Sequence, residues 1–309
     1  MSEKTKILCV VGPTASGKTA LGVQLAKALQ GEIINADSMQ IYKGISIASA
    51  APTEDEKQGV LHHLFEFLEP SYSFTVADYV EAAHKKIAEI VSRGKLPVIV
   101  GGTGLYINSL IDNVKFLGDA ANEELRKTLA EELEQVGSKK MYERLTSLDP
   151  KAAEKIHPND AKRIIRALEL SLSGGLTKTE QNELSKKEES PYDVTLIGIT
   201  YKDREKLYER INLRVDLMLE NGLLDEALKA YNAANSGGAV QAIGHKEFFD
   251  FFSGEITLDE ATDNLKRATR RYAKRQLTWF NREERINWIY ADCQDDTVKE
   301  ALRIIERKE

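Results

Sequence analysis

The chain has 309 residues, of which 42% are hydrophobic and 30% are charged, and its formal net charge is −6. This composition is typical of a soluble globular protein, argues against indiscriminate nucleic-acid binding and includes no apolar run near the ~20 residues of a membrane span. Because two cysteines, Cys9 and Cys293, cannot form a disulfide framework and the first residues lack the features of a secretory signal, we expect a cytoplasmic protein.

A phosphate-binding loop follows the first predicted strand, the apolar run 7–11. The loop has the pattern G-x-x-x-x-G-K-[ST] and consists of Gly12, Pro13, Thr14, Ala15, Ser16, Gly17, Lys18 and Thr19. In this pattern, backbone N–H groups and a helix N-terminus surround phosphate oxygens, Lys18 adds a mobile charge, and Thr19 can ligate Mg²⁺. Because the amphipathic run 21–29 supplies the helix, we predict a polyphosphate site rather than an ordinary glycine-rich turn.

Two further predicted strands end in segments that can meet a ligand. Strand 32–35, preceded by a helix stop at Gly31, leads to Asp37, and strand 96–100 leads to the glycine-rich turn 101–106. Ligands of open α/β sheets bind beyond the carboxyl ends of the strands, so we expect Asp37 and the phosphate loop to face one crevice.

Strand signals are missing between Gly118 and about Ser190, where the sequence is helical and charged. Helices are predicted at 76–91, 122–135, 139–148, 161–171, 204–221, 223–233, 258–282 and 295–308, and later strands at 193–199 and 286–290. We therefore predict an α/β fold with a P-loop NTPase-like parallel-sheet core, formed by residues 1–117 and 191–309, and a helical insertion domain at 118–190.

The sequence lacks the groups that accompany a phosphate loop in an ATPase or GTPase. Strand 96–100 ends at Gly101, where an ATPase usually carries a magnesium-binding Asp, and the chain has no D-x-x-G switch or N-K-x-D guanine motif. A small-molecule kinase stays open, because such an enzyme can use a carboxylate such as Asp37 as the base for its substrate.

A basic helix is predicted near the C-terminus. Residues 262–285 contain eight Lys or Arg and three Asp or Glu, a local balance of +5. Leu265, Tyr272 and Trp279 recur every seven residues on another side of this helix and predict a packing seam. The basic stripe suits an RNA backbone, and a solvated helix face is the alternative.

Several short motifs occur in one order along the chain, at 12–19, 37–42, 62–64, 101–106, 157–160, 163, 166–169, 241–244 and 272–280. With these motifs the chain closely resembles the bacterial tRNA dimethylallyltransferase family over nearly its whole length. The resemblance implies that the phosphate loop binds dimethylallyl diphosphate, with Mg²⁺ as cofactor. It also implies transfer of the dimethylallyl group to the N6 amine of the adenosine 3′-adjacent to the anticodon in tRNA. We expect a monomer that binds the anticodon stem-loop and has no membrane contact.

The resemblance assigns roles to individual residues. Lys18, Thr19 and Asp37 are the expected catalytic residues, with Asp37 as the base for the adenine amine, although Asp37 could instead form an Asx turn or cap a helix. One or both of Arg210 and Arg214 are expected to hold the diphosphate, with a solvated helix Arg as the alternative. The expected tRNA contacts are Asp37, Ser38, Met39, Gln40, Thr103, Arg126, Lys162, Arg163, Arg166, Gln241, Arg271 and Lys274. Among them, Ser38 and Gln40 are candidates for reading the edge of the adenine.

Three residues depart from the family pattern: Ala51 replaces a customary Lys, His245 a customary Tyr, and Lys162 a common Gln. We expect Ala51 to remove a phosphate or tRNA contact, and His245 and Lys162 to remain able to meet RNA. The adjacent His62 and His63 lack the spacing of a helical metal pair, which favours a structural role.

Two other functions stay open beside the kinase. A prenyltransferase that acts on a free adenine nucleotide would have little use for the insertion or the basic helix. An RNA-binding protein without chemistry is disfavoured by the intact Lys18, Thr19 and Asp37.

Overall fold

The computed structural model describes residues 4–116, 122–173, 177, 179–180, 183, 188–233 and 242–308. The chain divides into a sheet unit, formed by Met1–Ile111 and Pro191–Glu309, and a helical unit, formed by Asp112–Ser190. The helical unit thus begins before Gly118, the residue at which we predict the insertion to start, and Gly118 lies outside the described residues.

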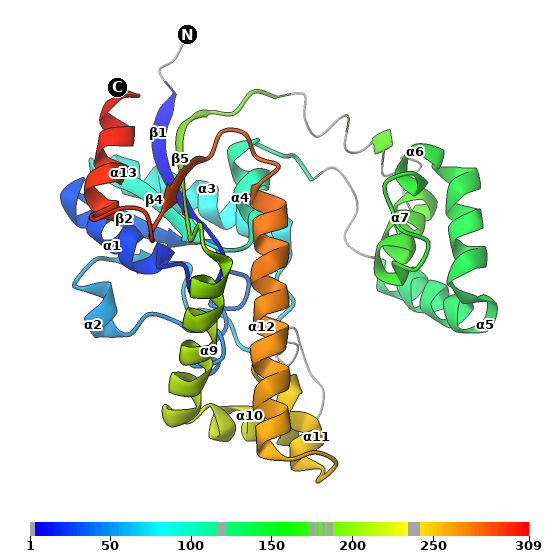
Figure 1. Ribbon diagram of the computed structural model, residues 1–309. Coiled ribbons are helices and arrows are strands. Elements are labelled where there is room, and N and C mark those ends of the chain that lie inside the picture. Colours follow the sequence, from blue (N-terminus) through cyan, green and yellow to red (C-terminus); the bar gives the residue numbers. More distant parts are fainter. Residues whose placement is uncertain are drawn as a thin grey trace. The chain divides into compact units, whose positions relative to one another are not determined.

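A six-stranded sheet forms the centre of the sheet unit, in the order β3-β2-β4-β1-β5-β6 (Figure 1). Its strands are β1 (Thr5–Val11), β2 (Gly31–Asn35), β3 (His62–His63), β4 (Leu96–Gly101), β5 (Tyr192–Thr200) and β6 (Asn287–Tyr290). All described strand pairs are parallel, and parallel strands need crossover connections, which here place helices on both faces. The predicted α/β fold with a parallel sheet is confirmed.

Alternating side chains of β1 enter two separate hydrophobic cores. Ile7, Cys9 and Val11 pack under α3 and α4, whereas Leu8 and Val10 pack under α1 and α13. The bounds of these helices are α1 (Lys18–Ala28), α3 (Val76–Ser92), α4 (Gly104–Ile111) and α13 (Thr297–Glu306). Since both faces of the central strand are buried, its sequence is continuously apolar rather than alternating.

A third core joins most of the helices that follow β5. They are α9 (Arg204–Glu220), α10 (Leu223–Asn232), the 3-10 helix η2 (Lys246–Phe248), α11 (Phe249–Phe252) and α12 (Leu258–Phe280). Leu223, Phe248 and Leu265 are buried in this core, and Ile47 and Ala48, from the segment after β2, pack against it. Figure 1 shows α9 and α12 side by side.

A capping box determines where α12 begins. The Thr257 hydroxyl accepts a hydrogen bond from the N–H of Glu260, and the Glu260 carboxylate accepts one from the N–H of Thr257 at 2.8 Å. The two bonds satisfy N–H groups that have no partner within the helix, and such a cap contributes about 1 kcal/mol.

The helical unit has its own core, formed by Leu129, Met141, Leu145 and their neighbours. Its helices are α5 (Glu123–Leu148), α6 (Pro150–Ala153) and α7 (Ala161–Ser173). Within α5 the helical backbone is broken at Gly137, where φ is 79° and ψ is 162°. This break lies between the two helices predicted at 122–135 and 139–148.

The two ends of the helical unit lie next to each other. The Asn113 side-chain amide donates to the carbonyl of Glu189 at 3.2 Å, and Lys115 Nζ lies 3.2 Å from the carboxylate of Glu188. The chain therefore enters and leaves this unit at one place.

Some details differ from the predictions. Gly31 does not end α1: the helix is capped at Leu29, Gln30 makes the turn with a φ of 52°, and Gly31 is the first residue of β2. The strand β3 and the helices η2 and α11 are too short to produce a periodic pattern, so the sequence does not reveal them. In the described residues, no helix is both long and apolar enough to cross a membrane.

The turn after β4 lies very close to two other segments. A Cβ added to Gly101 would lie 2.1 Å from the carbonyl oxygen of Ala36, and one added to Gly104 would lie 2.2 Å from Cδ1 of Trp279. These distances are shorter than van der Waals contacts, so the turn requires glycine at both positions.

We predict that Gly101→Ala lowers the free energy of unfolding of the sheet unit by about 1–3 kcal/mol, because its Cβ must push β2 and β4 apart. Both tryptophans, Trp279 and Trp288, lie in the sheet unit, so their fluorescence during urea unfolding reports this unit. The control is Lys85→Ala, at an exposed position of α3, which should keep the parent midpoint. Equal midpoints for the two variants would contradict the prediction.

Candidate active site

The phosphate loop joins β1 to α1. Gly17, with a φ of 96°, is the N-cap of α1, and the helix begins at Lys18, whose Nζ donates to the carbonyl of Pro13 at 3.3 Å. Burial lowers the pKa of Lys18 to about 8; the nearby Asp37 opposes this shift and Arg214 adds to it. The ammonium group therefore lies where an anion would stabilise its charged form.

Gln276 of α12 fixes the phosphate loop against the turn after β4. Its Oε1 accepts a hydrogen bond from the N–H of Thr14 at 2.8 Å, and its Nε2 donates to the carbonyl of Gly102 at 2.9 Å. The side chain is buried, so both polar ends need these partners. No role for Gln276 is predicted from the sequence; the available signal is a glutamine four residues after Tyr272, near the seam of α12.

Asp37 follows β2 and forms an Asx turn. Its Oδ1 accepts a hydrogen bond from the N–H of Met39 at 2.9 Å, while Oδ1 of Asn35 accepts one from the N–H of Asp37 at 3.1 Å. Asp37 also lines a cavity together with Lys18 and Thr19. The turn fixes the position of the carboxylate, and the cavity places it beside the phosphate loop.

Thr103 fixes the segment that contains Ser38. Its Oγ1 accepts a hydrogen bond from the N–H of Ser38 at 3.0 Å and donates to the Ser38 hydroxyl at 3.4 Å. Thr103 also hydrogen-bonds to the hydroxyl of Tyr272, whose pKa is raised by burial. The structure therefore brings Asp37, Ser38 and Thr103 together, as expected from the meeting of β2 and β4 at one edge.

Arg210 and Arg214 project from α9 toward the phosphate loop. Nε of Arg210 donates to the carbonyl of Ala15 at 3.0 Å, and Nη2 of Arg214 donates to the carbonyl of Ala50 at 3.3 Å. Burial lowers the pKa of Arg214, against an opposing attraction from Asp37. Because carbonyl groups carry no net charge, both guanidinium groups are oriented without being neutralised.

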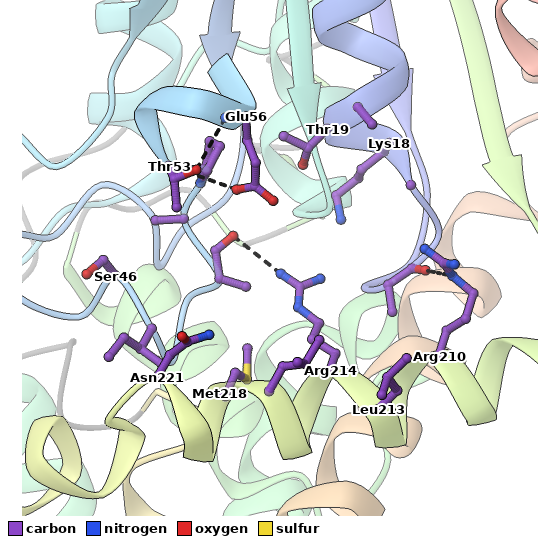
Figure 2. A pocket seen from close by; sticks show the side chains of 18 residues that line it. Lys18, Thr19, Ser46, Thr53, Glu56, Arg210, Leu213, Arg214, Met218 and Asn221 are labelled. Carbon is purple, nitrogen blue, oxygen red and sulfur yellow. Dashed lines mark hydrogen bonds between the residues drawn. The ribbon is translucent and has the colours of Figure 1, made fainter. Parts of the chain in front are cut away.

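Two cavities share one wall beside the phosphate loop. The larger has a volume of about 680 Å³ and is lined by Arg210 and the start of α1, and Figure 2 shows Lys18 and Arg214 directed toward it. The smaller has a volume of about 320 Å³ and is lined by residues 37–40 and by apolar side chains of α9 and α12. The residues that line both are Lys18, Thr19, Ala50, Arg214 and Met218.

Gln40 lines the smaller cavity, but its amide nitrogen is already engaged. Nε2 donates to the carbonyls of Ser49 and Ala50 at 3.1 and 3.0 Å. Met39, the other predicted contact in this segment, is partly buried against a small core around Ile41. The role of Gln40 in reading a base stays a prediction. In this arrangement both N–H groups of its amide are bonded to the protein, so its amide oxygen is the group that could face a base.

Four of the predicted tRNA contacts lie in the helical unit. Arg126 and Arg166 both pair with the buried carboxylate of Glu169, at 3.1 and 2.9 Å. Arg163 lies 3.3 Å from Asp160, and Lys162 is exposed. Both arginines on Glu169 remain nearly half exposed, so their fixed guanidinium groups can still face a ligand.

The basic residues of α12 fall into two groups. Lys266 pairs with Asp216 at 2.6 Å and Arg270 donates to Asn212 at 2.6 Å, so these two face α9. Arg271 and Lys274 are exposed, as a surface that binds RNA requires. Gln241, another predicted contact, lies outside the described residues.

The expectation that His245 can meet RNA is wrong in this structure. His245 is completely buried, and its Nε2 lies 2.9 Å from the carboxylate of Glu226. The imidazole therefore packs inside the sheet unit. Its polar Nε2 atom provides a hydrogen-bond partner for the buried carboxylate of Glu226.

The residues around Thr19 fit a Mg²⁺ ion that is held mainly by phosphate oxygens and water. Within the described residues there is no group of three His, Cys, Asp or Glu side chains that could hold a metal ion. Among these residues, His63 belongs to no such group: its Nε2 lies 2.7 Å from the carboxylate of Glu32, and Nη2 of Arg93 lies 2.6 Å from the same carboxylate. Mg²⁺ commonly keeps several waters and uses one or two protein ligands with phosphate oxygens, and the Thr19 hydroxyl beside both cavities fits that mode.

Comparison with known proteins identifies a family for this chain. A family model described as IPP transferase matches residues 40–283, a range that begins just after the phosphate loop and Asp37. The chain is 49% identical over 295 residues to the tRNA dimethylallyltransferase of Acetivibrio thermocellus, with 95% of this chain and 94% of that protein covered. It is 47% identical over 289 residues to that of Bacillus subtilis, with 93% and 91% covered.

Solved structures agree with this result. The full-length tRNA isopentenylpyrophosphate transferase of Bacillus halodurans matches with a TM-score of 0.72 and 45% identity, covering 99% of this chain and 96% of that one. A eukaryotic dimethylallyltransferase described as acting on tRNA matches with a TM-score of 0.80 and 30% identity, covering 97% of this chain and 78% of that one.

We predict that binding of inorganic diphosphate weakens as the pH rises through the Lys18 pKa of about 8, because Lys18 then loses its charge. Between pH 7 and pH 9 the charged fraction of such a group falls about tenfold, and the affinity should fall by up to that factor. Titration calorimetry of the parent and of Lys18→Met measures it. The variant lacks the titrating amine, so an equal pH dependence in both proteins would contradict the prediction.

Proposed function

The chain belongs to the IPP transferase family, as its motifs predict, and on this basis we propose that it is a tRNA dimethylallyltransferase. It transfers the dimethylallyl group of dimethylallyl diphosphate to the N6 amine of the adenosine 3′-adjacent to the anticodon and releases diphosphate. Its tRNA substrate implies that it acts in the cytoplasm. We also propose that the active form is a monomer.

One observation carries the proposal: Asp37, Lys18 and Thr19 line the same cavity. Transfer forms a bond between N6 and the first carbon of the allyl group and breaks the bond from that carbon to the diphosphate oxygen. The electron pair of the broken bond leaves with the diphosphate, and the amine loses a proton. A base on one side of the reacting carbon and cations on the other are what this reaction requires.

The cations stabilise the leaving group. Lys18, Arg210 and Arg214 are held by backbone carbonyls, so their charge is available to the diphosphate. We propose that Thr19 holds the Mg²⁺, which supplies further positive charge at the phosphates when bound. Apolar side chains of the smaller cavity, such as Val215 and Leu265, provide a surface for the hydrocarbon group.

Asp37 has the position of the base. The Asx turn holds its carboxylate at the cavity that also contains Ser38 and Gln40. The reacting adenine must leave its stack to enter such a cavity, as bases do in other enzymes that modify nucleic acids. With two cavities meeting at Lys18 and Arg214, we propose that the diphosphate lies on the side of the larger cavity and the adenine on the side of the smaller one.

The exposed cations favour tRNA over a free nucleotide. A free adenine nucleotide would need only the cavities, whereas Arg271 and Lys274 on α12 and the arginines of the helical unit offer charge to a long RNA backbone. The family membership also disfavours the small-molecule kinase. Deletion of the helical unit distinguishes a tRNA substrate from a free nucleotide, because prenylation of tRNA should be lost and prenylation of a free nucleotide should not.

The direct test is incubation of the protein with dimethylallyl diphosphate, Mg²⁺ and unmodified tRNA, followed by mass analysis of the nucleosides. We expect an adenosine heavier by one dimethylallyl group and an equal amount of released diphosphate. AMP in place of tRNA tests the free-nucleotide alternative, and ATP with AMP tests the kinase. Modification of AMP at the rate for tRNA would overturn the proposal.

We predict that Asp37→Asn lowers kcat about 10²–10⁴-fold with little change in either KM, because the variant keeps its size and an acceptor oxygen but loses the basic group. Steady-state kinetics with varied tRNA and dimethylallyl diphosphate measures this. Near-normal turnover, or a loss confined to tRNA affinity, would show that Asp37 only forms the turn or contacts RNA.

We predict that replacing both Arg271 and Lys274 with Ala weakens tRNA binding and reduces its salt dependence by about one unit of slope for each lost phosphate contact. Binding is measured by filter retention between 50 and about 200 mM salt, a range in which phosphate contacts change affinity strongly. Lys266→Ala is the control, because Lys266 lies on the same helix but pairs with Asp216. The prediction fails if the double variant keeps the parent slope.

A further inference from the structure

The segment 46–52, which we name the wall loop, separates the two cavities. Its residues Ser46, Ile47, Ala51 and Pro52 line the larger cavity, Ala48 and Ser49 line the smaller, and Ala50 lines both. It contains no helix or strand and is held by turns, among them the bond from the N–H of Ala51 to the carbonyl of Ser46 at 2.9 Å. Its position therefore depends on contacts with other parts of the chain.

The wall loop in turn orients two residues of the proposed site. The carbonyl of Ala50 accepts hydrogen bonds from Nη2 of Arg214 at 3.3 Å and from Nε2 of Gln40 at 3.0 Å. Arg214 lines both cavities and is proposed to hold the diphosphate, whereas Gln40 lines only the cavity proposed for the adenine. A displacement of this one carbonyl would change both sides at once.

Glu226 of α10 holds the wall loop from behind. Its Oε2 accepts a hydrogen bond from the N–H of Ile47 at 3.0 Å, and its Oε1 accepts one from the N–H of Ala48 at 2.9 Å. Nε2 of His245 lies 2.9 Å from the same Oε1. Glu226 and His245 are both buried, and neither lines either cavity.

The hydrogen-bond pattern favours an ionised carboxylate. Two backbone N–H groups and Nε2 of His245 meet the two oxygens of Glu226, and a deprotonated carboxylate accepts from all three when the imidazole proton is on Nε2. Burial raises the pKa of Glu226, but the bonds from His245, Ala48 and Ile47 outweigh it and hold the pKa below its usual value. Nδ1 of His245 is buried without a hydrogen-bond partner in the described part of the chain, so the polar contact of the ring there is the one between Nε2 and Glu226.

We propose that Glu226 and His245 are positioning residues that hold the wall loop, and through the Ala50 carbonyl set the geometry of Arg214 and Gln40 for prenyl transfer. This inference rests on the proposed function. It assigns a role to His245, the residue that stands where the family pattern has Tyr. The pair acts through the backbone of the loop and touches no substrate.

The kinetic test uses His245→Phe, which removes the donor, and His245→Gln, whose amide keeps one at similar reach. For His245→Phe we expect KM for dimethylallyl diphosphate to rise about tenfold through Arg214, the factor that corresponds to one lost hydrogen bond of this kind, and kcat to fall through the displacement of Gln40 on the adenine side. The affinity for tRNA should stay unchanged, because contacts of exposed cations with the RNA backbone provide most of it. His245→Gln should recover most of the KM. An unchanged KM, or a tRNA affinity that falls in step with KM, would overturn the proposal.

Hydrogen exchange on the full-length protein tests the contact without any substrate. In Glu226→Gln, peptides that cover residues 46–52 should exchange about tenfold faster, since both backbone N–H groups lose a charged acceptor, while peptides from β1 keep the parent rate. Asp225→Asn, the exposed neighbour on α10, is the matched control. Exchange at the parent rate in the wall loop of Glu226→Gln would overturn the proposal.

Failure of the parent protein to modify tRNA would instead overturn the proposed function. The exchange result would still show whether Glu226 holds the wall loop.

Discussion

The side-chain amide of Gln276 joins an early and a late part of the chain, and the site depends on it. Its two hydrogen bonds hold the phosphate loop and the turn after β4 against α12. Such close packing against α12 leaves no room for a Cβ at Gly102, where it would lie 2.2 Å from Nε2 of Gln276, or at Gly104, where it would lie 2.2 Å from Cδ1 of Trp279. Because α12 also carries Arg271 and Lys274, one buried amide sets the distance between the reacting groups and the proposed RNA surface.

The charges of the protein are arranged in two different ways. Lys18, Arg210 and Arg214 are bound to carbonyl oxygens, which orient a cation but leave its charge uncompensated. Arg126 and Arg166 share a carboxylate, so two cations meet one anion and a single positive charge remains. The first arrangement suits a small ligand that carries several negative charges, and the second suits a contact with a single phosphate of a polymer.

The sequence predicts the parts of the site that depend on local pattern. The phosphate loop and Asp37 each follow an apolar strand, and parallel strands bring their carboxyl ends to one edge, so their meeting can be predicted. The partners Gln276, Glu226 and Glu169 could not be found in this way, because burial of a polar residue depends on contacts far along the chain. His245 illustrates the limit: its residue type suggests a surface contact, whereas the packing of η2 places it inside.

The adjacent ends of the helical unit have a consequence for the evolution of the protein. A segment that leaves and rejoins a host at one place can be lengthened, exchanged or removed at a small cost in loop-closure entropy, since its own ends are already fixed by Asn113 and Lys115. The sheet unit, with its reacting groups, can then stay constant while the inserted unit diverges. With the proposed role of its arginines in binding tRNA, selection for a different RNA shape would act on the insertion and leave the chemistry unchanged.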